Sequence, residues 1–369
     1  MDPAVLEAMK PYLLGAYGNP SSTHAHGRQL RNAIEQSRRT ISQELGAQPA
    51  EIIFTSGGTE ADNLAIRGLV ESYGLKAVIS SPIEHHAVTH CIEKLEEEGL
   101  IQAVWLTPGE DGLINPDDLK AALEAHPESM VSLMHANNEL GSILDLQVIG
   151  EICREAGVYF HSDTVQSMTN ARFNMEALPV DLLTASAHKF NGPKGVGFLY
   201  ARKGIRLGSQ ICGGSQERGY RAGTENVASI VGMAKAFQLT YAKFDQKHDH
   251  LVKLRSYMKE QLSQVIPGVS FNGAKNDSYA MPTVLNVTFP DTVAEGMLLF
   301  QLDLEGVSVS GGSACQSGAQ KGSHVLHGIG KPASEIGRTV RFSFGLSNTI
   351  DEIDFVVGKL QSMVGNPVV

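Results

Sequence analysis

Cysteines are few in this sequence, and no pattern pairs them. The four cysteines are widely scattered over 369 residues and form no Cys-x-x-Cys motif, which argues against a disulfide framework and a zinc cluster. Apolar runs of about 18 to 20 residues, long enough to cross a membrane, are also missing, and the chain opens Met1-Asp2-Pro3 without a basic and apolar leader. We therefore expect a soluble cytoplasmic protein that does not associate with membranes.

Clusters of positive charge are missing as well. The chain has 30 Lys and Arg residues against 40 Asp and Glu residues, a net charge of -10, and no basic run of the kind that binds nucleic acid. Nucleic acid is therefore not an expected partner. The composition is otherwise ordinary, with 42% apolar and 19% charged residues in a chain long enough for two domains.

Short apolar runs alternate with helical patterns in the first half of the chain. The runs are typical of strands at 52–55, 77–80, 131–134, 158–161 and 182–185. This alternation predicts an α/β fold with a mostly parallel sheet covered by helices.

The remainder of the chain predicts a second, smaller domain. A pattern almost without breakers from about 231 to 265 predicts one long connecting helix. An α+β domain is indicated by strands at 284–289, 307–310 and 339–344 and a helix near 295–304. We place the boundary near Asp245, giving a large domain of residues 1–245 and a small domain of residues 246–369. The first residues of the chain could pack with the small domain.

Lys189 and Asp163 suggest pyridoxal phosphate chemistry. Lys189 lies in the segment Ser186–Gly195, and Asp163 lies shortly before it in His161–Ser167. A lysine amine can hold the cofactor aldehyde as a Schiff base, and a carboxylate facing the ring nitrogen keeps that nitrogen protonated. A lone lysine is more often a solvated surface charge, so the hypothesis depends on three further elements.

The first element is the turn Ser56-Gly57-Gly58-Thr59, where a strand ends and a helix begins. Free amides and the positive end of the helix dipole favour an anion, and Thr59 adds a hydroxyl donor, so the turn has the outline of a phosphate cradle. By itself a Gly-Gly turn is commonly only a connection. No Gly-Lys-Ser/Thr follows, so it is not a Walker loop.

The second element is the pair His85-His86, which cannot both serve one site from a regular element. One of them could stack on a cofactor ring and carry a proton near neutral pH. The alternative is a histidine at a helix start bonded to backbone. His135 and His161 have the same alternative.

The third element is Cys315, which lies in a segment of Gly, Ser and Ala from 309 to 322. Cysteine is usually buried, so a cysteine with so little around it to pack suggests a reactive thiol on a mobile loop. An ordinary thiol is only about 3% ionised at pH 7, so its surroundings must activate it. Cys91 and Cys153 lie in helical patterns and are expected to pack, whereas Cys212 is ambiguous.

Together these segments resemble the cysteine desulfurases, in the class V aminotransferase group of fold-type I pyridoxal phosphate enzymes. The resemblance covers nearly the whole chain and includes Gly18–His24, His135–Gly141, Gly213–Thr224 and Ser310–Cys315. It implies the fold-type I transferase architecture, in which a large domain has a seven-stranded, mostly parallel sheet and a smaller α+β C-terminal domain carries the cysteine loop. The segment around Cys315 resembles the subgroup with the longer loop, which is linked to iron-sulfur cluster assembly.

The resemblance also implies roles for individual residues. Lys189 holds the cofactor, and the other contacts to it fall to Gly58, Thr59, His85, Asn138, Asp163, Gln166, Ser186, His188 and Thr224. Among these, Asp163 faces the pyridine nitrogen, His85 stacks on the ring, and Thr224 comes from a second subunit, which implies a homodimer. Arg341, with help from Asn138, binds the substrate carboxylate, because a guanidinium fork matches a carboxylate in a bidentate way. Without the resemblance, Arg341 would be interpreted as a surface arginine.

The implied activity is the removal of sulfur from L-cysteine with pyridoxal 5'-phosphate, giving L-alanine and a persulfide on Cys315. Lys189 and His85 are the candidate proton carriers. The persulfide goes to a sulfur acceptor such as an iron-sulfur scaffold protein. No metal site is expected, although Cys315 could contribute a ligand to a transient cluster.

Two alternatives stay open: another class V activity such as selenocysteine lyase, and a non-enzymatic role in binding sulfur-transfer partners. The sequence also departs from the family pattern at both ends. It begins without the N-terminal strand that normally borders the substrate site, and it ends without the extended tail by which some members bind a scaffold protein. The first departure leaves the completeness of the substrate site an open question, and scaffold docking is not assumed.

Overall fold

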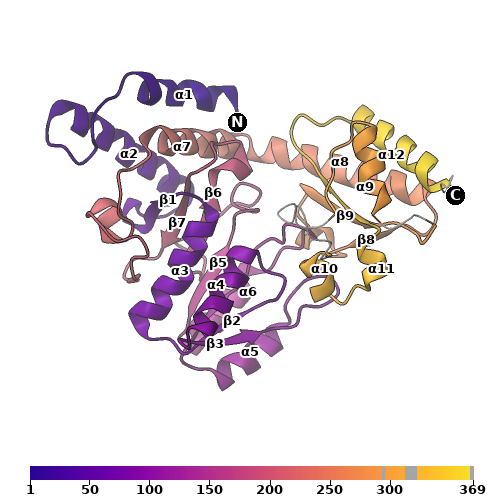
Figure 1. Ribbon diagram of the computed structural model, residues 1–369, viewed down its shortest axis with the longest axis horizontal. Coiled ribbons are helices and arrows are strands. Elements are labelled where there is room, and N and C mark those ends of the chain that lie inside the picture. The colour runs from indigo at the N-terminus through magenta and orange to yellow at the C-terminus, as the bar shows by residue number, and fades with distance from the viewer. Residues whose placement is uncertain (293–295, 312–321, 366–369) are drawn as a thin grey trace. The chain divides into compact units, whose positions relative to one another are not determined.

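The computed structural model describes residues 1–292, 296–311 and 322–365, and the segment that contains Cys315 lies outside them. The chain divides into two compact units. Unit 1 comprises residues 1–106, 116–135 and 145–244, and unit 2 comprises residues 107–115, 136–144 and 245–369. Unit 2 therefore takes two short inner segments from the first half of the chain (Figure 1).

Unit 1 is built on a seven-stranded sheet in the order β1-β7-β6-β5-β4-β2-β3. The strands are β1 (Ile52–Thr55), β2 (Ala77–Ser80), β3 (Gln102–Trp105), β4 (Ser129–Ser132), β5 (Tyr159–Asp163), β6 (Leu182–Ser186) and β7 (Gly197–Ala201). Only β7 runs against its neighbours, so the predicted α/β fold with a mostly parallel sheet is confirmed. The inner strands are buried along their whole length, as expected for a sheet covered on both faces.

The helices of unit 1 bury apolar faces against this sheet and against one another. They are α1 (Pro3–Leu14), α2 (Ala25–Glu44), α3 (Gly58–Tyr73), α4 (His86–Glu97), α5 (Pro116–Ala125), α6 (Leu146–Ala156) and α7 (Val227–Ala242). In α3 the positions Ala61, Leu64, Ala65 and Leu69 recur at helical spacing and are buried in the main core cluster. The N-terminal helix α1 packs against α7, also within unit 1 (Figure 1).

The helix predicted from about 231 to 265 is wrong as a single element. The structure has α7 followed by α8 (Phe244–Val265), with Lys243 between them at φ -110° and ψ 17°, outside the helical region. The hydrophobic pattern also changes at this point, because α7 is buried along most of its length and α8 only along one face. Continuous helical composition therefore concealed a break between two differently packed helices.

Unit 2 has a three-stranded antiparallel sheet in the order β10-β9-β8. Its strands are β8 (Ser270–Asn272), β9 (Val284–Thr288) and β10 (Thr339–Ser343), and its helices besides α8 are α9 (Met297–Leu304), α10 (His324–Gly328), α11 (Ala333–Ile336) and α12 (Ile350–Gly365). The predicted strand at 307–310 is wrong, since the structure has only an isolated bridge there, between Ser310 and Arg341.

Short 3-10 turns complete the two units: η1 (Pro49–Glu51), η2 (Ala187–Phe190), η3 (Gln216–Gly219) and η4 (Asp277–Tyr279). Within the described part of the chain, no helix is both long enough and apolar enough to span a lipid bilayer.

Candidate active site

The carboxyl ends of the parallel strands bring polar residues to one edge of the unit 1 sheet. Asp163 ends β5, Ser186 ends β6, and the turn before α3 follows β1. Because β1 and β6 are both antiparallel to β7 and β6 is parallel to β5, all three strands end at the same edge. This is the edge at which open α/β sheets bind ligands.

The N-terminus of α3 lies directly against this edge. Gly57 at the N-cap has no side chain to cap the first turn, so the amides there depend on other partners. A Cβ added at Gly58 would lie 2.7 Å from Cγ2 of Val165 and 3.6 Å from Cβ of Ser186. A side chain at position 58 would collide with Val165, so glycine lets the N-terminus of the helix approach the ends of β5 and β6.

Asp163 is a buried carboxylate with few local partners. Its Oδ1 accepts a hydrogen bond from the amide of Val165 at 2.8 Å. Burial, and secondarily the charge of Asp62, raises the pKa of Asp163 to about 7, while nearby His85 acts in the opposite direction. A carboxylate in such surroundings gains from a cation placed beside it, because the cation would offset the cost of removing the charge from water.

Lys189 lies on the short turn η2, which begins directly after β6. The turn is closed by Asn191, a non-glycine residue in the left-handed region at φ 61°. Its neighbour His188 places Nδ1 2.9 Å from the hydroxyl of Ser186. Burial, together with the charges of Lys189 and Lys194, lowers the pKa of His188, so the imidazole is neutral at physiological pH.

The histidines occupy well-defined positions. His85 is the N-cap of α4, and its Nδ1 accepts a hydrogen bond from the amide of Ala87 at 3.1 Å, as in the alternative of a helix-start histidine. His85 also lines an open groove of about 520 Å³ together with Thr59. His135 and His161 are buried, and burial lowers the pKa of each to about 4. Neither imidazole is therefore positively charged near pH 7, which argues against both as the acid of the reaction.

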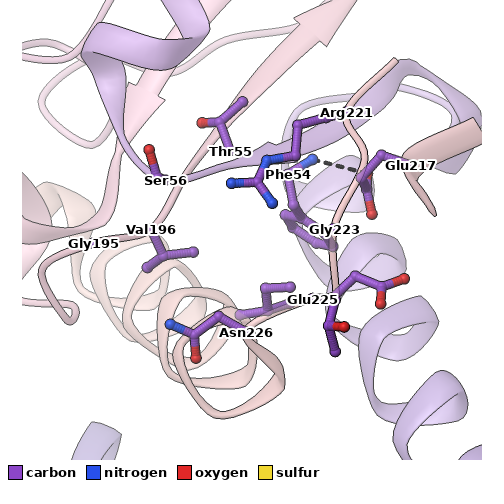
Figure 2. Close-up of a pocket in the computed structure, with 12 residues that line it drawn as sticks. Phe54, Thr55, Ser56, Gly195, Val196, Glu217, Arg221, Gly223, Glu225 and Asn226 are labelled. Carbon is purple, nitrogen blue, oxygen red and sulfur yellow. Dashed lines mark hydrogen bonds between the residues drawn. The ribbon is translucent and has the colours of Figure 1, made fainter. Parts of the chain in front are cut away.

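Gln166 and Thr224 lie on irregular segments of unit 1. Gln166 follows Asp163 in the turn after β5, where its carbonyl accepts a hydrogen bond from Asn170. Thr224 lines a cavity of about 260 Å³ with Ser56, Val196 and Glu225. Figure 2 shows this cavity between the end of β1 and the segment before α7. The structure does not bring Thr224 into contact with the other predicted phosphate contacts.

Arg341 and Asn138 lie together in unit 2. Nη1 of Arg341 donates to the carbonyl of Asn138 at 2.9 Å, and Nη2 lies 3.4 Å from the hydroxyl of Ser310. The backbone of Arg341 also pairs with Ser310. The position predicted to bind a substrate carboxylate is thus hydrogen-bonded to a residue just before the Cys315 segment.

The far side of that segment is held by a buried acid that the sequence motifs did not single out. Glu139 accepts a hydrogen bond from the hydroxyl of Ser323 at 2.5 Å, and Ser323 caps α10 by accepting from the amide of Leu326. Burial raises the pKa of Glu139. The described residues on both sides of the Cys315 segment are therefore fixed by Asn138-Glu139 and Arg341.

Other functional candidates that sequence reasoning missed are also buried acids: Asp62, Glu84 and Glu217. Asp62 follows Ala61 on α3 and precedes Leu64, so a charge within an apolar helical pattern was the available signal. Glu217 accepts from Nη1 and Nη2 of Arg38, each at 2.7 Å, and from the amide of Phe54, as Figure 2 shows for Phe54. No local pattern in the sequence indicates that pairing.

The described cysteines are distinguished by burial. Cys91 and Cys153 are buried, as expected for packing residues, and burial raises the pKa of each to about 12. Cys212 is exposed. Over the residues that the structure describes, no three His, Cys, Asp or Glu side chains are grouped so that they could hold a metal ion.

Comparison with known proteins places this arrangement in a family. The model of the class-V aminotransferases matches residues 1–356. A cysteine desulfurase IscS from Dictyoglomus turgidum is 43% identical over 362 residues, covering 98% of this chain and 91% of the relative.

Solved structures agree with that sequence match. A NifS-like protein has a TM-score of 0.90 at 32% identity, covering 99% of this chain and 96% of its own. A structure described as SspA in complex with cysteine has a TM-score of 0.82 at 33% identity, covering 93% of this chain and 95% of its own. By sequence and by fold, the chain belongs to the class V aminotransferase family.

Proposed function

We propose that this chain is a cysteine desulfurase, which uses pyridoxal 5'-phosphate to convert L-cysteine to L-alanine and a persulfide on Cys315. The observation that carries the proposal is the meeting of Asp163, Ser186 and the α3 N-terminus at one sheet edge, with Lys189 on the turn that follows Ser186. The curated relatives named cysteine desulfurase, and a structural neighbour solved with cysteine, support the same activity.

The residues at this edge fit the cofactor. The approach of α3, which glycine at position 58 permits, makes backbone amides available to a phosphate beside Thr59, Ser186 and His188. The buried Asp163 carboxylate suits a protonated ring nitrogen, and Lys189 supplies the amine. When bound, pyridoxal phosphate supplies an electron sink for bonds at the substrate α-carbon.

The chain's own residues have the remaining roles. Arg341 would bind the carboxylate of cysteine through its guanidinium fork, with Asn138 beside it. His85 would serve at the ring through Nε2, because its Nδ1 accepts from Ala87. The amine of Lys189 would accept the proton removed from the substrate α-carbon and hold it for later return. Gln166 would contact the ring oxygen.

Cys315 performs the sulfur transfer in this proposal. Its thiolate attacks the substrate sulfur, forming a sulfur–sulfur bond as the bond between that sulfur and the β-carbon breaks. The electron pair stays with the carbon, which takes up a proton and becomes the methyl group of alanine. The sulfur is oxidised to the persulfide level and the carbon is reduced, so no outside oxidant is needed. The persulfide then passes to an acceptor, for which an iron-sulfur scaffold protein is the candidate.

The same proposal includes a homodimer in which Thr224 completes the phosphate site of the partner subunit. This assignment is compatible with the position of Thr224 at a separate cavity of unit 1. Equilibrium sedimentation of the wild type and Thr224→Val tests it. We expect a dimer in both, with weaker cofactor binding in the variant; a fully active monomer would contradict it.

The activity is tested by mixing the purified protein, loaded with pyridoxal phosphate, with L-cysteine and measuring alanine and sulfide. Cys315→Ala should retain the visible absorption of the bound cofactor and lose alanine formation, whereas Cys212→Ala, the exposed control, should retain both. Undiminished alanine formation by Cys315→Ala would overturn the role of Cys315. Turnover of selenocysteine alone would favour selenocysteine lyase.

A further inference from the structure

Asp62, on α3, is a buried acid that the proposed reaction does not use. It is 1% exposed, and its Oδ1 has no hydrogen-bond partner among the described residues. That oxygen lies 3.5 Å from Nε2 of His161, which is itself completely buried. A carboxylate removed from water is stabilised by a proton or by a charged partner. The protonation states of Asp62 and His161 are therefore coupled.

His161 is held by hydroxyls from the strands on both sides. Its Nδ1 lies 2.9 Å from Oγ of Ser132 on β4, and its Nε2 lies 3.1 Å from Oγ1 of Thr184 on β6. The Thr184 side chain also hydrogen-bonds to Asp62. These contacts fix the imidazole ring, and Thr184 bridges it to Asp62, whose Oδ1 lies 3.5 Å from Nε2.

This pair lies next to Asp163. His161 and Asp163 are two residues apart on β5, so their side chains project from the same face of the sheet. The charge of Asp62 raises the pKa of Asp163. A change in the charge of the pair therefore changes the pKa of Asp163, the carboxylate proposed to face the cofactor ring.

We propose that Asp62 and His161 form a buried pair that shares one proton and thereby sets how strongly Asp163 holds a positive charge at the cofactor ring nitrogen. Asp62 is then a positioning residue that acts through Asp163. The inference rests on the proposed function, because it takes pyridoxal phosphate to be the group at Asp163.

The titratable groups around the pair influence the pH at which it loses its proton. Asp62 on α3 faces His161 and Asp163 on β5, Glu84 before α4 and Cys91 on α4. With one proton, the pair is neutral whether the proton is on Asp62 or on His161. When that proton leaves, a negative charge appears next to Asp163. Burial raises the pKa of Asp62 to about 8 and lowers that of His161 to about 4, which puts the proton on Asp62 at neutral pH.

The first test is the pH titration of the visible absorption of protein loaded with pyridoxal phosphate. The wild type should show a broadened transition, because the pair loses its proton in the same range. Asp62→Asn should give a single step with a midpoint lower by roughly half a pH unit, since a negative charge that favours the protonated cofactor is gone. A folded Asp62→Asn protein with the wild-type titration would overturn the proposal.

Asp181→Asn is the matched control. Asp181 is a partly buried acid, 26% exposed at its side chain, whose pKa burial also raises, but it accepts from the amide of Phe160 at the opposite ends of β5 and β6. It should leave the titration unchanged. An equal shift in Asp181→Asn would show that any lost acid has this effect, and the pair would have no special role.

The second test needs no cofactor. In the apoprotein a raised pKa for Asp62 means that its contribution to stability is lost as the pH rises toward about 8. His161 has the opposite trend, but only below its ordinary pKa of 6.5. Between pH 6.5 and 8, wild type should therefore lose more stability in urea than Asp62→Asn. Parallel stability curves over this range would contradict a shared proton.

Thr184→Val keeps the proposal testable if Asp62→Asn does not fold. Valine has nearly the shape of threonine, and the change removes the hydroxyl that lowers the pKa of Asp62. The pair should then keep its proton to higher pH, so the broad transition should move upward; no movement would count against the pair. Failure of the wild type to bind pyridoxal phosphate is a different outcome, which would remove the proposed function itself.

Discussion

Units 1 and 2 hold their candidate site residues in different ways. In unit 1 the polar groups stand at the ends of β5 and β6 and at the first turn of α3, so regular backbone fixes them. In unit 2 the backbone of Arg341 lies on β10, and its guanidinium is held by a carbonyl at Asn138 and a hydroxyl at Ser310, both outside regular elements. The position of this guanidinium thus depends on contacts with irregular segments as well as on its own strand.

Among the variants proposed here, Lys189→Ala should have the largest effect on alanine formation. Lys189→Ala removes the amine from the turn after β6, so covalent cofactor attachment and a proton carrier are lost together. We expect alanine formation to fall on the order of 10⁴-fold, measured together with the visible spectrum. Lys194→Ala, an exposed lysine in the same segment, should leave both nearly unchanged. Retained attachment in Lys189→Ala would show that unit 1 does not hold the cofactor there.

Arg38→Met tests whether a side-chain pair supports the regular framework of unit 1. Arg38 and Glu217 are both buried and joined by two bonds of 2.7 Å. Removing one partner leaves a buried charge, so we expect a loss of about 3 to 5 kcal/mol in the free energy of unfolding, measured in urea. Arg67→Met, which breaks a more exposed pair with Glu98, should cost at most about 1 kcal/mol. Equal losses of unfolding free energy in Arg38→Met and Arg67→Met would refute the distinction between the buried pair and the more exposed pair.

Arg341→Lys addresses unit 2 directly. Lysine keeps the charge but loses the planar fork, so kcat/KM for L-cysteine should fall roughly 10- to 100-fold while the cofactor spectrum stays the same. Arg338→Lys, at a partly exposed residue three positions earlier in the chain, is the control. A changed spectrum in Arg341→Lys would mean that the two units are not functionally separable in this way.

Asp163→Asn should give the smallest effect, a change in the pH dependence of the free energy of unfolding of the apoprotein. Burial raises the pKa of Asp163 to about 7 from 3.8, so the wild type loses stability as the pH rises through this range. Asparagine does not ionise, and we expect the variant to be more stable than wild type by about 1 to 2 kcal/mol at pH 8, and by less at pH 4. Cofactor binding should nevertheless weaken. A variant that is less stable at pH 8 would contradict the stated cost of burying this carboxylate.

Much of the sheet could be predicted from sequence. Runs such as Ile52–Thr55 and Ala77–Ser80 match β1 and β2, because strands buried on both faces are largely apolar along their whole length. Two strands were missed: β3, which is partly exposed and includes Gln102, and β7, which starts at Gly197. The composition of β3 does not separate it from a loop, whereas β7 is an apolar run that sequence reasoning missed.

The candidate site was predictable where a motif is local. Lys189, Asp163 and Gly58 lie on one sheet edge as their motifs indicate, although their roles in the reaction stay predictions. Contacts between distant segments were not predictable, as for Glu139 with Ser323 and Asp62 with His161. The domain boundary at 245, the homodimer and the cytoplasmic location also stay predictions.

The two outermost strands of the unit 1 sheet, β1 and β3, each have a backbone amide that is hydrogen-bonded to a glutamate side chain. At one edge Glu217 accepts from the amide of Phe54 in β1, and at the other Glu96 accepts from the amide of Ala103 in β3. A strand from another molecule would have to displace a charged side chain to bond there. We therefore expect these two glutamates to disfavour the pairing of a further strand with the sheet, which makes them the positions to preserve when the protein is concentrated or engineered.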